Sequence, residues 1–313
     1  MLPLTLKQLR YVEAAGRTRS ISAAAEDQNI SESSIASAIG ALEASLGFDL
    51  FSRVPSKGIN PSPAGWDCLK LISKILREFD EFQTELLAIG GNLVGTVRLA
   101  CFASATSGFL PAAIESFQQE YPGVTFKLVE GSMDAVIDHI DSGLADIAFS
   151  YEEVTTEAHQ FNSLVSLPHY ALLPSRDPLS QKRGVSLKDL STRPMVNLEL
   201  ERTKTYYVNL LKDAGLKVIV AHHTRSAEMV RTLVASGIGF SILNARAGNL
   251  SHADGGFRAV PIIDRLRDRE FGLIRPSAMR QPRVVRRFAD HCLKLRAEGA
   301  FEALSLRYNH SLE

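Results

Sequence analysis

The chain has few cysteines, a single tryptophan, no long apolar run and no excess of either charge. Its three cysteines, Cys68, Cys101 and Cys292, lie far apart without a Cys-x-x-Cys spacing, which favours reduced thiols over a disulfide framework or a zinc site. The apolar runs are too short to cross a bilayer, and the N-terminus lacks a basic stretch followed by an apolar one. We therefore predict a cytoplasmic chain without a membrane segment or a secretory signal.

The balance of charges gives no sign of a nucleic-acid partner. Lysine and arginine together number 35, and so do aspartate and glutamate. Residues 1–62 are also balanced, with six basic and six acidic side chains. A basic stripe is the usual electrostatic mark of a DNA-binding domain, so DNA binding has to be inferred here from the pattern of residues.

No arrangement of residues points to an enzyme. His222 and His223 are adjacent, so on a strand they point to opposite faces and do not share a metal ion. Gly237-Ile238-Gly239 lacks the third glycine of a dinucleotide-binding loop. Glu152 and Glu153 have no apolar setting that would make one an acid and the other a base at neutral pH. We predict no catalytic residue, no metal site and no cofactor.

The N-terminal pattern is instead typical of a helix-turn-helix. Apolar residues between positions 6 and 12 give a first helix one apolar side. Ser20 is a suitable N-cap for an alanine-rich second helix, and Ser31 is one for a third helix that Gly47 ends. Two helices separated by a short break at residues 29–31 are the mark of this motif.

A predicted hairpin and a long helix follow. Apolar residues flank Pro55-Ser56-Lys57-Gly58, which predicts a β-hairpin wing. The helix from about Pro63 to Ile89 has apolar residues every three or four positions, close to a heptad repeat. We predict that this apolar side pairs with a second chain; the alternative is packing on its own domain. The predicted dimerisation residues are Leu69, Ile72, Leu76 and Phe79.

The rest of the chain alternates strands and helices. Two successive βαβαβ units, at 97–150 and 195–243, imply parallel sheets. Strands near 258–263 and 270–275 are expected to return to the first unit before a last helix. The pattern predicts an α/β domain of two lobes that holds a ligand between them.

A set of positions in the first part of the chain falls at the spacing of a known family. These positions are Leu6, Leu9, Ala23, Ala24, Ser31, Ile35, Ile39, Leu42, Glu43, Leu46, Gly47, Leu50, Phe51, Arg53, Ala64 and Gly65. On these residues the chain resembles the LysR-type transcription regulators. The looser matches further along are Phe109-Leu110-Pro111, Tyr121-Pro122, Gly143-Leu144-Ala145-Asp146 and the run from Leu233 to Gly239.

The resemblance implies an α/β fold with an N-terminal winged helix-turn-helix, a long linker helix and a C-terminal bilobed effector domain like a periplasmic binding protein. The implied domains are 1–62 for DNA binding, 63–92 for the dimerisation helix and hinge, 93–300 for the regulatory domain and 301–313 for a C-terminal tail. Lobe I comprises about 93–165 and 270–300, and lobe II about 166–269. The family also implies a dimer of dimers, a homotetramer, whose effector domains shift the DNA-binding heads.

The start of the third helix normally faces base edges in the major groove. This chain departs from the family there, because Glu32 stands in the place of a common glutamine and Ala36 in that of a serine. The predicted DNA-binding residues are Ser22, Ser31, Glu32, Ser33, Ser34, Ser37, Arg53 and Lys57. The alternatives are an exposed polar face for the serines, stabilisation of the helix end for Glu32, and a solvated surface for Arg53 and Lys57.

The resemblance implies an effector site in the cleft between the lobes, lined from helix starts and strand ends. Hydroxyl groups and free backbone N–H groups at such places suit a small organic acid. The predicted residues are Ser104, Thr106, Ser132, Asn197, Glu199, Arg202 and Ser226. Ser132 and Ser226 have a simpler alternative as plain N-caps.

The function that follows is a DNA-binding transcription regulator under the control of a small-molecule effector. Its predicted partners are double-stranded operator DNA, the effector and further copies of the chain, with no membrane. The first alternative is a solute-binding receptor, since residues 93–300 alone look like one. The second is a thiol-based redox regulator, which requires two thiols close enough to bridge.

Overall fold

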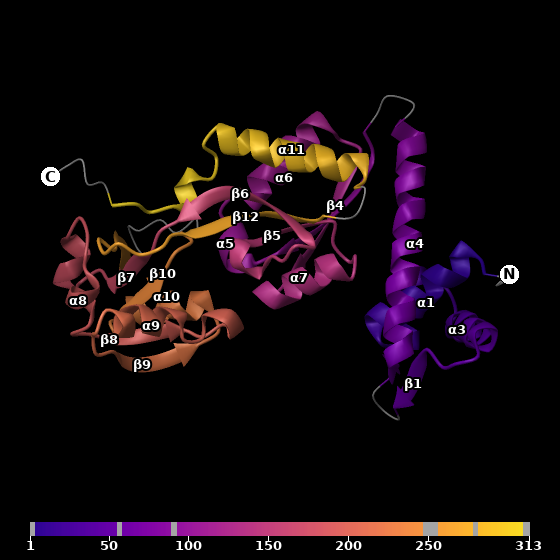
Figure 1. The fold of residues 1–313 in the computed structure, drawn as a ribbon, viewed down its shortest axis with the longest axis horizontal. Helices are drawn as coiled ribbons and strands as arrows, with labels where there is room; N and C mark the ends of the chain where they lie inside the picture. Colours follow the sequence, from indigo (N-terminus) through magenta and orange to yellow (C-terminus); the bar gives the residue numbers. More distant parts are fainter. Residues whose placement is uncertain (1–3, 55–57, 89–92, 247–255, 278–280, 309–313) are drawn as a thin grey trace. The chain divides into compact units, whose positions relative to one another are not determined.

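The computed structural model of the chain describes residues 4–54, 58–88, 93–246, 256–277 and 281–308 (Figure 1). The chain forms two compact units, Met1–Asn92 and, apart from four residues at the end of helix α7, Leu93–Glu313. The first unit has one hydrophobic core and the second has two.

The first unit is a winged helix-turn-helix followed by a long helix. Its elements are α1 (Leu6–Thr18), α2 (Ile21–Gln28), α3 (Glu32–Leu46), β1 (Phe51–Val54), β2 (Gly58–Pro61) and α4 (Pro63–Ala88). Ser20 and Ser31 accept hydrogen bonds from backbone N–H groups at the starts of α2 and α3, as predicted. Gly47 ends α3 with a φ of 79°, in the left-handed region that favours glycine.

The core of the first unit forms where α1, α2 and α3 meet the apolar side of α4. Val12 and Ile35 have no exposed surface, and Leu69, Ile72 and Leu76 of α4 close this core with 4–7% exposed. Strands β1 and β2 form an antiparallel hairpin in which Arg53 is opposite Ile59. The predicted wing residue Lys57 lies outside the described residues.

The first lobe of the second unit is a five-stranded sheet in the order β4-β3-β5-β12-β6. Its strands are β3 (Gly95–Cys101), β4 (Val124–Glu130), β5 (Ile147–Tyr151), β6 (His159–Leu167) and β12 (Arg269–Pro276). Its helices are α5 (Ala103–Thr106), α6 (Leu110–Glu120), α7 (Met133–Asp141), α11 (Arg283–Ala297), η1 (Glu152–Val154) and η4 (Glu302–Leu304). Strands β3, β4 and β5 are parallel, and β12 is antiparallel to both of its neighbours.

The second lobe has two small sheets, β10-β7-β11 and β8-β9. Its strands are β7 (Tyr170–Pro174), β8 (Pro194–Leu198), β9 (Ile219–Thr224), β10 (Ser241–Leu243) and β11 (Phe257–Pro261). Its helices are η2 (Pro178–Gln181), α8 (Leu187–Leu190), η3 (Glu201–Thr203), α9 (Tyr206–Asp213) and α10 (Ala227–Ala235). The chain enters this lobe between β6 and β7 and leaves it between β11 and β12, so two connections join the lobes.

Two features of the second unit differ from the sequence prediction. Strands β6 and β7 fall in a stretch where no strand was predicted. Of the two late strands, β12 returns to the first lobe as expected, whereas β11 stays in the second lobe beside β7. Strand β12 runs antiparallel to β5 and β6 and so makes the first sheet mixed, because a strand that returns from the other lobe is not bound by the βαβ crossover rule.

Candidate nucleic-acid interface and ligand pocket

Helix α3 presents a polar end and an outer face of small side chains. Its inner face is buried in the core through Ile35, Ala38, Ile39 and Leu42. The exposed residues are Glu32, Ser33, Ser37, Gly40, Ala41, Ala44 and Ser45. None of them is lysine or arginine, so this face offers hydrogen bonds and close approach without positive charge.

The serines at the start of α3 are linked to one another. The Ser31 hydroxyl caps the helix by accepting from the Ser34 backbone N–H at 3.3 Å. It also lies 2.9 Å from the hydroxyls of both Ser33 and Ser34. Ser22 is exposed on α2, and Glu32 is exposed in the first turn of α3. The predicted DNA-binding residues of α2 and α3 therefore lie at the surface, with Ser34 half-buried.

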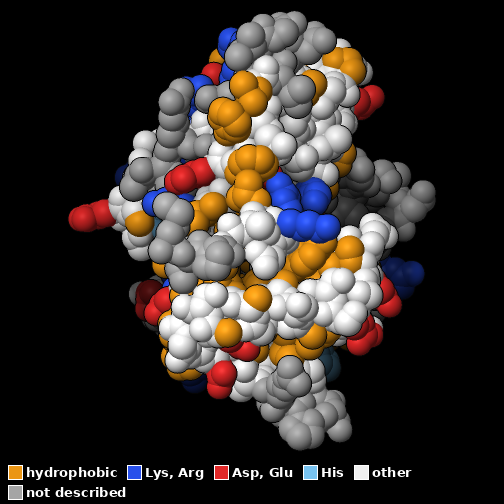
Figure 2. All heavy atoms as spheres, turned by 90° about the vertical axis from the view of Figure 1, so that its right-hand side faces the viewer, with side chains coloured by type: hydrophobic (Ala, Val, Ile, Leu, Met, Phe, Trp, Pro, Cys, Tyr) orange, Lys and Arg blue, Asp and Glu red, His pale blue; other side chains and the backbone are white. Residues whose placement is uncertain are grey.

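Two arginines of the helix-turn-helix are neutralised inside the unit. Arg10 pairs with Asp80 of α4 at 2.6 Å, and Arg17 pairs with Glu13 at 3.5 Å and with Asp27 at 2.5 Å. In Figure 2, basic side chains occupy small separate groups among apolar and uncharged ones and form no continuous patch. The described side chains of this face therefore form no positive surface of the kind that alone would hold DNA.

Three of the four predicted dimerisation residues, Leu69, Ile72 and Leu76, serve the chain's own core, which corrects the prediction for these three. Leu69, Ile72 and Leu76 are buried in the core of the first unit, where α4 contacts α1, and a Cβ on Gly16 of α1 would lie only 2.6 Å from the Leu69 side chain. Phe79 is half-buried. Other apolar side chains of α4 remain exposed; they are Trp66, Leu71, Ile75, Phe82 and Leu86. The apolar periodicity of α4 thus reflects, at these three positions, packing within the chain, which was the alternative to pairing with a second chain.

The predicted effector residues of the first lobe are engaged in local structure. Thr106 is 3% exposed, and its hydroxyl donates to the Phe102 carbonyl at 3.3 Å. Ser132 accepts from the Ala135 N–H at 3.2 Å as the N-cap of α7. Ser104 lies in α5. The two hydroxyls with described contacts thus act as a backbone partner and a cap, and ligand binding by these residues stays a prediction.

The predicted effector residues of the second lobe also have partners within the chain. Asn197 is fully buried and donates to the Lys204 carbonyl at 2.9 Å. Glu199 lies 3.5 Å from the Lys204 ammonium group. Ser226 caps α10 through the Met229 N–H at 3.2 Å. Arg202 pairs with Asp134 on α7, so this pair joins the two lobes at the surface.

A small cavity between the lobes is lined by other residues than the predicted ones. It encloses about 30 Å³, room for about two water molecules. Its lining residues come from both lobes; they are Phe102, Tyr151, Leu198, Leu200, Tyr207, Ala227, Arg231, Leu243, Asn244, Ala245 and Arg269. Several are immediate neighbours of predicted residues, because Leu198 stands between Asn197 and Glu199, and Ala227 follows Ser226.

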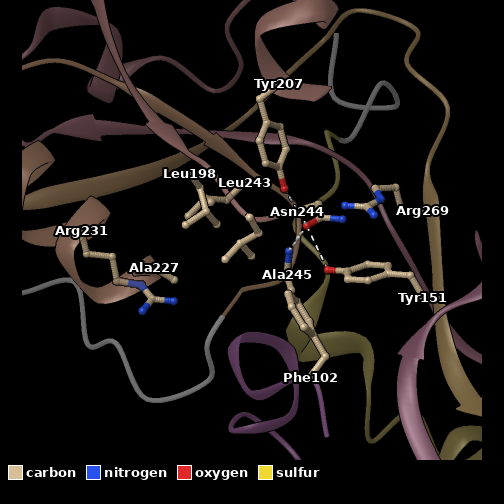
Figure 3. A pocket seen from close by; sticks show the side chains of 11 residues that line it. Phe102, Tyr151, Leu198, Tyr207, Ala227, Arg231, Leu243, Asn244, Ala245 and Arg269 are labelled. Atoms are coloured by element: carbon tan, nitrogen blue, oxygen red, sulfur yellow. Dashed lines mark hydrogen bonds between the residues drawn. The ribbon is translucent and has the colours of Figure 1, made fainter. Parts of the chain in front are cut away.

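Asn244 is at the centre of this cavity, as Figure 3 shows. Its Oδ1 accepts from the Tyr151 hydroxyl at 3.1 Å, the Tyr207 hydroxyl at 3.4 Å and the Ala245 N–H at 3.0 Å. Its Nδ2 is buried and has no hydrogen-bond partner among the described residues. A buried donor without an acceptor is costly, so this amide favours an acceptor atom in the cavity.

Positive charge lines the same cavity. Arg269 is 7% exposed, donates to Glu153 at 2.6 Å and lies 4.1 Å from the centre of the Tyr151 ring. Burial alone would lower the pKa of Arg269, but Tyr207, Tyr151 and Glu153 raise it above its usual value. Burial raises the pKa of Tyr207 to about 12, so its hydroxyl stays protonated and donates. Arg231, on α10, supplies a second guanidinium, which pairs with Glu228 at 3.3 Å.

The cysteines and the acidic and histidine side chains show no reactive arrangement among the described residues. All three cysteines are free, and burial raises the pKa of both Cys101 and Cys292 to about 12. No group of three His, Cys, Asp or Glu side chains that could hold a metal ion occurs in the described part. No described helix is both long enough and apolar enough to cross a membrane.

The sequence matches two family profiles. The profile of the bacterial regulatory helix-turn-helix protein of the lysR family matches residues 6–66. The profile of the LysR substrate binding domain matches residues 90–297. Together they span the helix-turn-helix with its wing and almost all of the two-lobed unit.

Similar proteins can be aligned with most of the chain. The HTH-type transcriptional regulator CysB of Burkholderia cenocepacia is 26% identical over 268 residues, which cover 83% of this chain and 83% of CysB. The solved structure of HinK, a LysR family transcriptional regulator of Pseudomonas aeruginosa, is 29% identical, with a TM-score of 0.61 over 94% of this chain and 98% of HinK. Full-length CbnR, solved with its target DNA, shares the fold at 20% identity, with a TM-score of 0.66 over 93% of this chain and 99% of CbnR.

Proposed function

The chain belongs to the LysR family of helix-turn-helix transcription regulators, and on that premise we propose that it is a cytoplasmic regulator that binds operator DNA as a dimer of dimers under the control of a small organic acid. Members of this family are DNA-binding regulators with an effector-binding domain and are not enzymes. The chain carries both domains.

The exposed polar start of α3 supports the DNA-binding part of the proposal. Ser33 and Ser37 have hydroxyls that donate or accept, and Glu32 is an acceptor suited to the amino group of cytosine. The small outer face of α3 lets its backbone come close to base edges. We assign these side chains, with Ser22, Ser31 and Ser34, to the major groove, and Arg53 and Lys57 of the wing to the phosphate backbone.

The remaining apolar side of α4 supports self-association. At 100° per residue, Leu71, Ile75, Phe82 and Leu86 fall within an arc of about 60°, next to the side that packs on the unit's own core. All four are exposed by 48–63% of their surface. A row of exposed large apolar side chains favours a protein partner, and we propose that this row, in place of Leu69, Ile72 and Leu76, contacts α4 of a second chain.

The unpartnered Nδ2 of Asn244 is the observation that carries the effector part of the proposal. A carboxylate oxygen in the cavity would accept from this amide and from the guanidinium of Arg231 or Arg269. The cavity holds only about two waters, so an organic acid enters when the lobes part. The Arg202–Asp134 pair joins the lobes at the surface, where an exposed ion pair contributes little and separates readily.

The two alternatives have no specific support. A solute-binding receptor has no use for the helix-turn-helix that matches residues 6–66. A redox regulator needs thiols that ionise, whereas burial raises the pKa of Cys101 and Cys292 to about 12.

Selection of duplexes from a random library by the full-length chain tests DNA recognition. We expect a recurrent motif with two-fold symmetry, because two heads of a dimer read two half-sites. Glu32→Gln should retain binding, raise the affinity for random duplexes and relax the preference at one base pair by roughly 1–3 kcal/mol. Failure of the folded wild-type chain to enrich any motif would contradict the proposal.

A thermal-shift panel of small carboxylic acids tests the effector pocket. A ligand that binds the native state raises the melting temperature. Arg231→Gln should abolish that rise, whereas Arg225→Gln, an exposed arginine at the loop before the same helix, should leave it intact. A shift that survives both Arg231→Gln and Asn244→Ala at unchanged ligand affinity would place the pocket elsewhere.

A further inference from the structure

Arg19 ends α1 in a conformation that is unfavourable for an arginine. Its φ of 53° lies in the left-handed region, which glycine adopts readily and in which the backbone of a residue with a Cβ atom is strained. Its side chain is exposed, so burial in the core does not compensate for the strain. A strained residue that persists at the surface points to a use for its side chain.

The backbone of Arg19 fixes it beside the wing. The Ile59 N–H donates to the Arg19 carbonyl at 3.1 Å, and Ile59 is opposite Arg53 in the hairpin. Because Ile59 lies between Arg19 and Arg53, the backbones of the two arginines are two strand spacings apart, about 10 Å. A Cβ on Gly58 would lie only 2.5 Å from the same carbonyl oxygen, so any residue other than glycine at this position would clash with it.

The side chain of Arg19 lies over the ring of Trp66, the chain's single tryptophan. The guanidinium carbon is 5.7 Å from the ring centre, within the range of a cation–π contact. Trp66 stands in the first turn of α4 with 44% of its surface exposed. Its indole N–H and the charge of Arg19 have no hydrogen-bond or ion-pair partner among the described residues. Arg10 and Arg17, in contrast, are each paired with a carboxylate.

We propose that Arg19 and Trp66 form a DNA-backbone contact beside the wing, in which the guanidinium donates to phosphate oxygens while the indole ring holds it in place and offers a second donor. This inference rests on the proposed DNA binding. Helix α3 has no basic residue, so this contact supplies positive charge that the recognition helix lacks. Phosphate contacts of this kind position a domain on any sequence.

The substitution Arg19→Gly separates a DNA contact from a role in stability. Glycine suits the left-handed backbone and keeps the carbonyl that Ile59 uses, so the melting temperature should stay at or above that of the wild type. Binding of the full-length variant to a random-sequence duplex should weaken. The slope of the logarithm of affinity against the logarithm of salt concentration should fall by about 0.9 for each DNA-binding head engaged. A fourfold rise in salt should then cost the wild type roughly threefold more affinity per head than it costs the variant.

Arg17→Gln is the matched control, because it removes the same charge from the same helix end but from a residue already paired with Asp27. It should leave the salt slope at the wild-type value. Trp66→Leu should weaken binding while retaining most of the slope, since the charge of Arg19 remains. An Arg19→Gly slope equal to that of wild type, or equal losses in both arginine variants, would overturn the contact. If wild type binds no duplex in a salt-dependent manner, the proposed function fails, and this contact with it.

Discussion

His169 shows how a single buried side chain in the lobe connection is held in one charge state. It lies 2% exposed, with its Nε2 2.9 Å from the Tyr206 hydroxyl and its ring near those of Tyr206 and Tyr207. Burial, reinforced by the positive charge of Arg269, lowers the pKa of His169 to about 4. The folded protein therefore keeps this ring neutral where an unfolded chain would begin to protonate it.

This shift predicts a specific dependence of stability on pH. Above pH 6.5, the ring is neutral in both states and its full contribution is present. As the pH falls from 6.5 towards 4, only the unfolded state takes up the proton, so the free energy of unfolding drops by up to about 3 kcal/mol. Denaturant titrations between pH 4 and 7 should show a steeper loss for wild type than for His169→Phe, which cannot titrate. Identical profiles for the two proteins would show that His169 does not carry this dependence.

Helix α4 has two apolar sides with different tasks, and substitutions should separate them. Leu76→Ala should lower the free energy of unfolding of the DNA-binding unit by about 2–4 kcal/mol, because it opens a cavity in a core where Leu76 is 7% exposed. Leu71→Ala, at a site 63% exposed in the single chain, should change the free energy of unfolding by less than about 0.5 kcal/mol at protein concentrations too low for the chains to assemble. Urea denaturation monitored by circular dichroism measures both.

The outer side of α4 makes a prediction about assembly. Leu71→Glu combined with Ile75→Glu should reduce the mass in sedimentation while the helix-turn-helix stays folded, because the charges face the partner and not the core. An unchanged mass would remove this side of α4 from the interface between chains. Substituting Leu76 instead would not test the interface, since it damages the core first.

The helices were largely predictable from the sequence, because the signals that start and end them are local. α2 and α3 begin directly after the predicted N-caps Ser20 and Ser31, and Gly47 ends α3 as predicted, because caps and apolar periodicity act over a few neighbouring positions. The periodicity of α4 was also clear, but a stripe such as Leu69, Ile72 and Leu76 does not record whether its partner is the same chain or another. Burial in the folded unit decides that question.

The central pocket was not predictable in the same way. Tyr151, Tyr207, Asn244 and Arg269 come from β5, α9, the end of β10 and the start of β12, and only the packing of two lobes brings them together. No local pattern marks Asn244, whose unpartnered amide becomes evident only when its neighbours are known. The sequence prediction instead selected helix starts such as Ser132 and Ser226, which cap their own helices.

At the scale of the whole molecule, the balance of charges means that DNA binding depends on several weak contacts more than on any single one. The chain has equal numbers of basic and acidic residues, and the arginines Arg10 and Arg17 are already paired. One DNA-binding head should therefore bind weakly. Several linked heads on one long operator gain effective concentration, so affinity and control should both depend on assembly. A ligand that favours one arrangement of lobes then changes DNA affinity through its different affinity for the two arrangements.

The most direct test of ligand-controlled DNA binding is a fluorescence-anisotropy titration of the full-length chain on its selected duplex, with and without a carboxylate that raises the melting temperature. We predict that a saturating ligand changes the DNA dissociation constant by about fivefold or more, and that DNA changes the ligand's dissociation constant by the same factor. Asn244→Ala should bind the duplex as the ligand-free wild type does and show no response. A DNA affinity that is unaffected by a saturating ligand in the wild type would contradict the account.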